Sequence, residues 1–118
     1  MDARVERKVL GLLGLGVRGR GAVVGVEQVR QAAYRNRLAF AVVAPDASRH
    51  SRAKIVPLLM GRHVRYVEGP TAAALGAAVG RVSAAVVGVV DPALAKGIRA
   101  VIDAAPGGMT GSRGEGRE

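Results

Sequence analysis

The chain has 118 residues, 49% of them hydrophobic and only 3% aromatic, so we expect one domain with an aliphatic core. It contains no cysteine, which excludes disulfides, thiolate zinc sites and cysteine nucleophiles, and no apolar run reaches the ~18 residues of a membrane span. Because the sequence shows neither a membrane span nor a charged segment ahead of a long apolar stretch, we expect a cytoplasmic protein. The formal net charge is +9, and Glu27 and Asp46 are the only acids between Arg7 and Arg65, so we expect a polyanionic partner such as nucleic acid.

The first part of the chain is predicted to form two helices and two strands. Apolar residues at helical spacing predict a helix over Ala3–Leu15, and a loop over 16–21 follows. Ala22–Val24 leaves room for a short strand, and Gly25–Asn36 has the periodicity of an amphipathic helix. The continuous apolar run Leu38–Ala44 predicts a strand that is buried on both faces.

The next segment contains a proline, which decides how we divide it. Asp46 or Ser48 is placed to cap the structure that follows. Because proline suits the first turn of a helix and not its interior, we predict a loose turn over His50–Val56 and a helix over Pro57–Arg62. A strand is expected at Val64–Glu68.

The rest of the chain continues the alternation of helices and strands. Thr71 is expected to cap a helix that ends near Gly80, and Ala84–Val90 is the next strand. Asp91–Ala104 is the last predicted helix. The alternation predicts an α/β fold, a single-domain three-layer α/β/α sandwich around a small mixed sheet. This domain would cover residues 1–105, and the polar, glycine-rich residues 106–118 are expected to be a disordered tail.

Catalytic motifs are scarce. The stretch GLGVRG, Gly14–Gly19, fits the dinucleotide fingerprint, but that fingerprint needs a preceding strand and the residues before it have helical periodicity. A nucleotide-dependent enzyme therefore stays a rival hypothesis only. His50 and His63 have no cysteine or nearby carboxylate in sequence, and Asp46 suits a helix cap better than a catalytic group. We expect no catalytic residue, no metal ligand and no cofactor.

The segment from Arg18 to Arg37 opens a helix without Ser, Thr, Asp or Asn as a cap. The first backbone N–H groups of a helix lack intrahelical partners, and the helix dipole makes that end positive. Gly25 at this start, with Arg18 and Arg20 upstream, suits a phosphate group. Glu27 and Gln28 could meet base edges, although Glu27 could also merely favour the positive helix end, an effect of roughly 0.3–1 kcal/mol.

The order of motifs resembles the ribosomal protein superfamily of the archaeal kink-turn-binding large-subunit protein (seven-Ae) and its thirty-e relatives, and most of all the small bacterial YlxQ group. The resemblance covers about Leu10 to Ile98. It lies in LGLGVRGRGAVVG, in LAFAVVAPDAS, in PLLM followed by VRYV, and in LGAAVG ahead of AAVVGVV.

The resemblance implies an α/β/α sandwich that binds RNA at one end. By matching position, the residues facing RNA would be Gly25, Glu27, Gln28, Gln31, Arg18, Arg20, Arg81 and Val82. Two departures from the archaeal pattern stand out, because Asn then Glu are replaced by Glu27 and Gln28, and a lysine is replaced by Gln31. Arg30 lies beside them and could restore some of the positive charge.

We therefore expect a non-enzymatic, monomeric protein that binds structured, kink-turn-like RNA, such as ribosomal RNA. Three aromatic residues are too few for a platform that stacks single-stranded bases. The alternative is a ribosome- or protein-docking module whose basic surface meets acidic proteins.

Overall fold

The computed structural model describes residues 1–104 and 112–113 of the chain. The helices are α1 (Ala3–Arg18), α2 (Val26–Tyr34), α3 (Arg49–Gly61), α4 (Ala72–Ala78) and α5 (Pro92–Ala104). The strands are β1 (Ala22–Val24), β2 (Phe40–Val43), β3 (Tyr66–Glu68), β4 (Val86–Val89) and β5 (Ser112–Arg113). None of the helices in this part of the chain has the length and hydrophobicity needed to cross a membrane.

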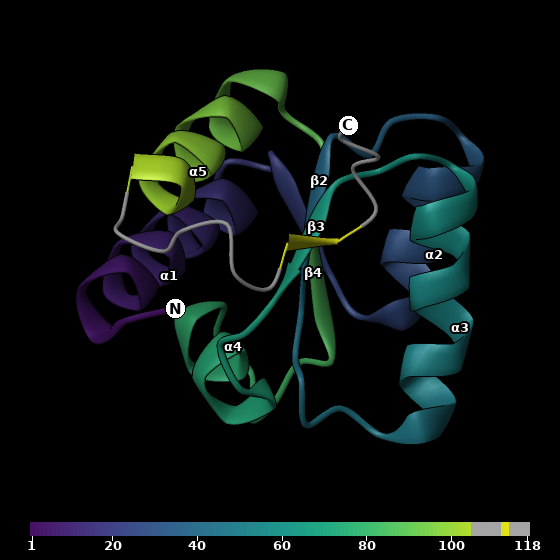
Figure 1. Ribbon diagram of the computed structural model, residues 1–118, viewed down its shortest axis with the longest axis horizontal. Coiled ribbons are helices and arrows are strands. Elements are labelled where there is room, and N and C mark those ends of the chain that lie inside the picture. Colours follow the sequence, from purple (N-terminus) through teal and green to yellow (C-terminus); the bar gives the residue numbers. More distant parts are fainter. Residues whose placement is uncertain (105–111, 114–118) are drawn as a thin grey trace.

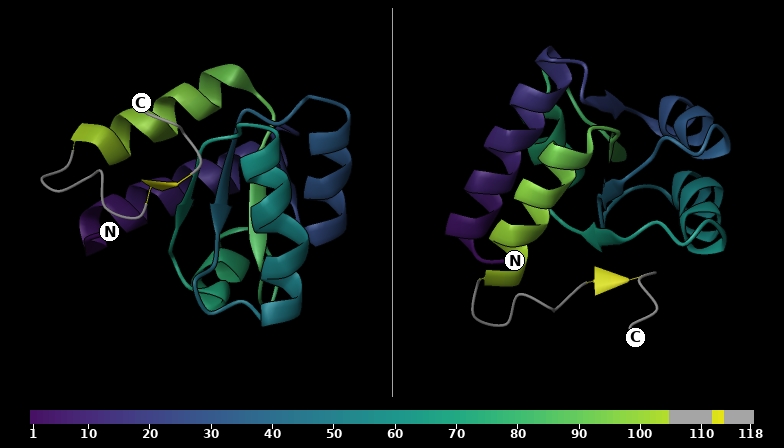
Figure 2. Two further views of the ribbon diagram at one scale, coloured as in Figure 1. Left: turned by 45° about the vertical axis from the view of Figure 1, so that its right-hand side comes forward. Right: turned by 90° about the horizontal axis from the view of Figure 1, so that it is seen from above.

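The strands form one mixed sheet in the order β1-β4-β2-β3-β5. Only β2 and β3 are parallel, and the other neighbours are antiparallel. Helices α1, α4 and α5 cover one face of the sheet, and α2 and α3 cover the other (Figures 1 and 2). The predicted three-layer α/β/α sandwich with a small mixed sheet is confirmed.

Each face of the sheet has its own apolar core, which explains the continuous apolar runs in the sequence. In β2, Phe40 and Val42 pack with α1, α4 and α5, while Ala41 and Val43 pack with α2 and α3. Successive side chains of a strand point to opposite faces, so a strand covered on both sides has no polar position. All four residues of β2 are accordingly buried.

Helix α3 differs from the prediction, because it is continuous where a turn was expected before Pro57. Pro57 cannot donate to the carbonyl group of Ala53, but both residues are exposed, so water can reach that carbonyl. Ile55 and Leu59, one helical turn apart, are buried and hold both sides of the proline against the sheet. The predicted turn over His50–Val56 is therefore wrong.

Helix α1 runs to Arg18, three residues beyond the predicted end, and so includes much of GLGVRG. A Cβ at Gly14 would lie 2.7 Å from the Ala78 carbonyl oxygen, and one at Gly16 would overlap the Leu94 side chain. These glycines allow α4 and α5 to approach α1 closely. The stretch is a helix-packing motif, and the preceding strand that a dinucleotide site requires is replaced by α1 itself.

The helix caps are those that the sequence predicts, except that Asp46 caps α4 and not α3. The Ser48 hydroxyl accepts a hydrogen bond from the Ser51 amide and caps α3, and Thr71 caps α4. Asp46 does not cap α3, since its carboxylate accepts from the Ala72 amide at the start of α4 (2.8 Å). The predicted disordered tail, 106–118, lies outside the described residues except for β5, which pairs with β3.

Candidate nucleic-acid interface

The start of α2 is uncapped, as the sequence predicts. Gly25 occupies the N-cap position, and no side chain there accepts a hydrogen bond from the first turn of the helix. Its φ of 97° and ψ of 160° lie in a region that only glycine adopts readily. The Gly25 amide donates to the Val86 carbonyl (2.9 Å), which fixes the helix start beside the first residue of β4. The amides of the first turn of α2 thus remain available to an acceptor outside the chain.

The loop between α4 and β4 lies at the same end of the sheet as Gly25, since Val24 pairs with Val87 in the register of β1 and β4. This loop carries the predicted residues Arg81 and Val82, and the Val82 side chain is 96% exposed. LGAAVG shapes the turn into the loop, because a Cβ at Gly76 would overlap the Ser83 backbone. The loop therefore presents a cation and a bare apolar side chain near the uncapped helix.

A cationic groove runs beside α2, between that helix and the edge strand β1. It encloses about 150 Å³, and we call it the α2–β1 groove. Its lining consists of Arg20, Val23, Gln28, Gln31, Ala32, Arg35, Arg37 and Val90. The lining offers guanidinium donors and carboxamides that both donate and accept, and it includes no acid. Such a set of groups suits phosphate oxygens.

Arg35 and Arg37 belong to this groove although sequence analysis did not select them. The residues Gln28, Gln31 and Arg35 follow helical spacing of three and four, which is a signal that could have found Arg35. Arg37 follows α2 as the chain turns toward β2, and only the folded structure places it in the same groove as Arg20. Arg20 itself has a φ of 65°, an uncommon conformation for a residue other than glycine.

The other exposed side of α2 carries a chain of polar contacts. The Arg30 guanidinium donates to the Tyr34 hydroxyl (3.0 Å) and lies 3.8 Å from the Glu27 carboxylate. Arg62 lies over the Tyr34 ring and donates to the Asn36 side chain (2.8 Å). The hydrogen bond to Tyr34 raises the pKa of Arg30, which stays positively charged. Arg30 therefore partly offsets the negative charge that Glu27 brings to the first turn.

Arg18 and Arg20 do not lie at the mouth of α2, contrary to the expectation from sequence. Both precede β1, and Gly21 pairs with Val90 and Asp91 at the far end of β4. The extended strand between Gly21 and Gly25 separates the two ends by about 13 Å. Arg20 still reaches the α2–β1 groove beside Gln28, whereas Arg18 lines a different groove, between α1 and α4.

In residues 1–104 and 112–113 no cluster of three or more His, Asp or Glu side chains could hold a metal ion. The carboxylates of Asp46 and Asp91 accept hydrogen bonds from backbone amides at the starts of α4 and α5. These two acids serve as helix caps.

Comparison with known proteins gives a consistent family match. Residues 7–99 match the ribosomal protein L7Ae/L30e/S12e/Gadd45 family. A Bacillus halodurans C protein of unknown function has a similar structure, with a TM-score of 0.74 and 29% identity, covering 81% of this chain and 97% of that chain. The Giardia lamblia 15.5kD RNA binding protein gives a TM-score of 0.74 at 18% identity, covering 86% of this chain and 87% of that chain. No curated protein has significant sequence similarity to the chain.

Proposed function

Because the chain belongs to the ribosomal protein L7Ae/L30e/S12e/Gadd45 family, we propose that it binds structured RNA and catalyses no reaction. The observation that carries the proposal is the uncapped start of α2 with the cationic α2–β1 groove alongside it. A similarly folded protein from Giardia lamblia is named as an RNA-binding protein, which agrees with this assignment.

The free amides of the first turn of α2 bind an RNA phosphate or base oxygen in this account, helped by the positive end of the helix dipole. Gly25 has no side chain, so the RNA backbone can come close to the helix. The carboxamides of Gln28 and Gln31 pair with base edges or sugar hydroxyls. Val82, exposed on the neighbouring loop, packs against the face of an unstacked base.

The guanidinium groups of the α2–β1 groove neutralise phosphates of the RNA segment that runs along α2. Arg20, which precedes β1, and Arg35, which ends α2, both line this groove, so a phosphate bound in it can accept from both. These contacts do not depend on base identity and position the RNA along the helix. Shape and backbone contacts then dominate recognition, as they do for folded RNA.

We further propose that the RNA contains a kink-turn or a similar bend, that it is ribosomal, and that the protein is a bacterial YlxQ-like member of the family. Gly25 and the loop that carries Arg81 and Val82 lie at the same end of the sheet, so both can contact one bend of an RNA chain. Glu27 and Gln31, which replace an asparagine and a lysine of the archaeal pattern, are expected to lower the affinity for a standard kink-turn.

Crosslinking in cells, followed by sequencing of the bound RNA, tests the proposal. Wild type should crosslink to a small set of folded RNA segments, and footprinting on total RNA should show protection of the same segments. A variant with Arg20, Arg35 and Arg37 changed to glutamine should lose these crosslinks. Recovery of protein crosslinks without any protected RNA would instead support the docking-module alternative.

A further inference from the structure

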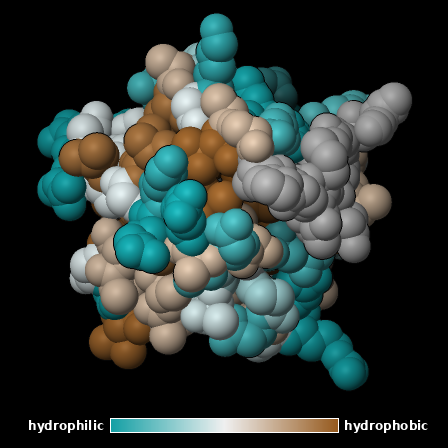
Figure 3. Space-filling model, turned by 60° about the vertical axis from the view of Figure 1, so that its left-hand side comes forward, coloured by the Kyte–Doolittle hydropathy of each residue, from teal (hydrophilic) through white to brown (hydrophobic). Residues whose placement is uncertain are grey.

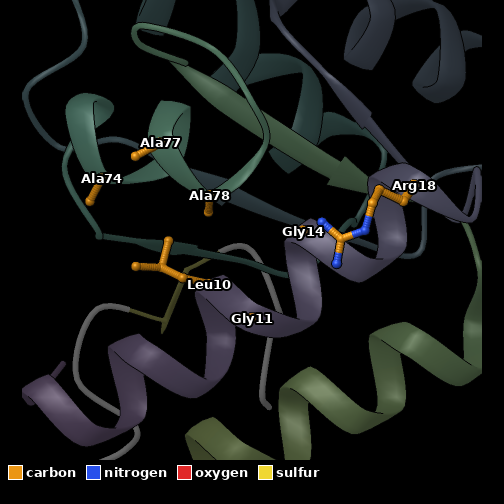
Figure 4. A pocket seen from close by; sticks show the side chains of 7 residues that line it. All are labelled: Leu10, Gly11, Gly14, Arg18, Ala74, Ala77 and Ala78. Atoms are coloured by element: carbon orange, nitrogen blue, oxygen red, sulfur yellow. The ribbon is translucent and has the colours of Figure 1, made fainter.

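A second groove lies on the other side of the sheet, between α1 and α4, and we call it the α1–α4 groove. It encloses about 490 Å³, a size typical of ligand pockets. Its lining is Leu10, Gly11, Gly14, Arg18, Ala74, Ala77 and Ala78 (Figure 4). The side of the molecule that carries α1, α4 and α5 also exposes apolar surface between polar side chains (Figure 3).

Gly11 in this groove has no explanation within the folded chain. A Cβ added there would meet nothing within 4 Å, in contrast to Gly14, which packs against the Ala78 carbonyl. Glycine inside a helix lowers its stability relative to alanine. The absent side chain nevertheless leaves the floor of the groove open, so Gly11 favours close approach by another molecule.

Two arginines flank the glycines on one face of α1. Arg7, Gly11, Gly14 and Arg18 follow spacings of four, three and four residues, which place them on one stripe roughly 16 Å long. Figure 4 shows the Arg18 side chain folded back over Gly14 toward the groove. Within the described part of the chain neither arginine has an ion-pair partner, and Glu6, the only acid of α1, pairs with neither.

The walls of the groove determine which kind of partner fits it. Both walls are helices whose backbone groups bond internally, so an extended peptide would find no main-chain partners there. A nucleic acid gains little here, because the groove floor is apolar and its cations are confined to the two ends of the stripe, Arg18 in the lining and Arg7 outside it. A helix satisfies its own backbone groups and can place apolar side chains over small residues.

We propose that the α1–α4 groove binds an amphipathic helix of a partner protein, with apolar side chains over Gly11 and Gly14 and acidic side chains opposite Arg7 and Arg18. The complementary charges fix the position of the partner along α1, and the glycines set its depth. Helices α1 and α4 lie across the sheet from α2 (Figure 1), so this site is separate from the α2–β1 groove and the proposal does not rest on RNA binding.

The test uses two designed helical peptides with the same alanine and leucine face, one flanked by glutamates and one by lysines. Amide chemical shifts of the full chain are followed during titration. The glutamate peptide should give saturable shifts at Gly11, Gly14 and Ala77 and bind at least about 10-fold more tightly than the lysine peptide. Absence of saturable shifts in the groove up to about 1 mM glutamate peptide would overturn the proposal.

Variants separate docking from folding. Gly11→Leu should weaken binding of the glutamate peptide by about 10-fold or more, while the melting temperature of the protein stays level or rises. Gly97→Leu is the matched control, because Gly97 is an α5 glycine whose Cβ would also meet nothing. It should bind like wild type. Arg18→Glu should reverse the preference in favour of the lysine peptide.

Unchanged binding by Gly11→Leu would overturn the proposed site, and so would equal losses in Gly11→Leu and Gly97→Leu. A third outcome would also overturn the proposal. If a structured RNA shifts the groove amides of wild type but not of Gly11→Leu, and the glutamate peptide shifts neither, the groove is part of the RNA-binding surface and does not bind a protein helix.

Discussion

Gly25 is required by the backbone of the protein before any RNA is considered. Its φ of 97° with ψ of 160° is strained for every residue that has a Cβ, although no neighbouring atom would obstruct that Cβ. The sequence places Gly25 at a helix start that suits a phosphate group. The structure adds a conformational reason, so loss of RNA binding in a Gly25 variant must be compared with loss of stability.

Gly25→Ala should lower the free energy of unfolding by about 1–3 kcal/mol, because alanine is strained at this φ and ψ. Urea denaturation followed by circular dichroism measures this change. Gly61→Ala is the control, since Gly61 ends α3 in open space without a positive φ. A Gly25→Ala protein as stable as wild type would show that the helix start relaxes to accept a side chain.

Glu27 and Gln31 are expected to limit the affinity of the protein for a standard kink-turn. An ionised glutamate only accepts hydrogen bonds, whereas an asparagine both donates and accepts. Glu27 also brings negative charge toward phosphates, and Arg30 at 3.8 Å offsets it only in part. The combined change Glu27→Asn, Gln28→Glu and Gln31→Lys should tighten binding of a standard kink-turn by about 10-fold, as one recovered base contact of roughly 1–3 kcal/mol allows.

Titration of wild type and this triple variant against a kink-turn and a duplex of equal length measures the effect. The gain should be confined to the kink-turn. If wild type already binds the kink-turn at low nanomolar affinity and the variant adds nothing, Glu27 and Gln31 are adequate for recognition as they stand.

At the scale of elements, α2 and β1 together form a surface that neither forms alone. Replacing Arg20, Arg35 and Arg37 with glutamine should reduce the slope of log affinity against log salt by about two to three units, at −0.7 to −0.9 per neutralised phosphate. The control carries three changes to exposed cations on α1 and α5, Arg4, Lys8 and Lys96 to glutamine, and should keep the slope. Equal slopes for both triple variants would place the RNA elsewhere.

Features that lie within one helix or strand could be predicted from the sequence, whereas features that depend on contacts between elements could not. The uncapped start of α2 and its exposed side follow from local periodicity and the absence of a capping residue. The meeting of Arg20 with Arg35 and Arg37 depends on how β1 folds back along α2, which no local pattern contains. The separation of Arg18 from Gly25 was missed for the same reason, and α3 was divided wrongly because the burial of Ile55 and Leu59 overrides the proline.

On the scale of the whole molecule, the sheet separates two surfaces of different character. Helices α2 and α3 form one layer, and α1, α4 and α5 form the other (Figure 1). The first layer carries the cationic α2–β1 groove, and the second carries the apolar α1–α4 groove. The layers and the mixed sheet were predictable from alternating helices and apolar strands. The strand order β1-β4-β2-β3 was not, because it depends on pairing between distant segments.

A pair that joins the end of α5 to the start of β3 makes stability depend on pH. Arg65 donates to the Asp103 carboxylate (2.6 and 3.1 Å), and this hydrogen bonding lowers the pKa of Asp103. The folded state therefore binds this proton less readily than the unfolded chain, whose aspartate pKa is about 3.9. The pair therefore contributes fully to the free energy of unfolding above about pH 3.9, and this contribution is lost as pH falls through the lower pKa of Asp103 in the folded state.

Thermal unfolding between pH 6 and pH 2 should consequently show a steeper acid decline for wild type than for Asp103→Asn, whose side chain does not titrate. The difference in melting temperature between the two proteins should be largest at neutral pH. It should be modest, because Asp103 is partly exposed. Parallel declines would mean that the pair does not couple α5 to the sheet in solution.

Amide chemical-shift mapping with a kink-turn RNA shows whether structured RNA binds at the start of α2 and along the α2–β1 groove. We expect the largest shifts at Gly25, Gln28, Gln31, Arg35 and Val82, with α5 unaffected. Saturable binding whose shifts are confined to α1 and α5, or no shifts with any folded RNA at low salt, would contradict this expectation.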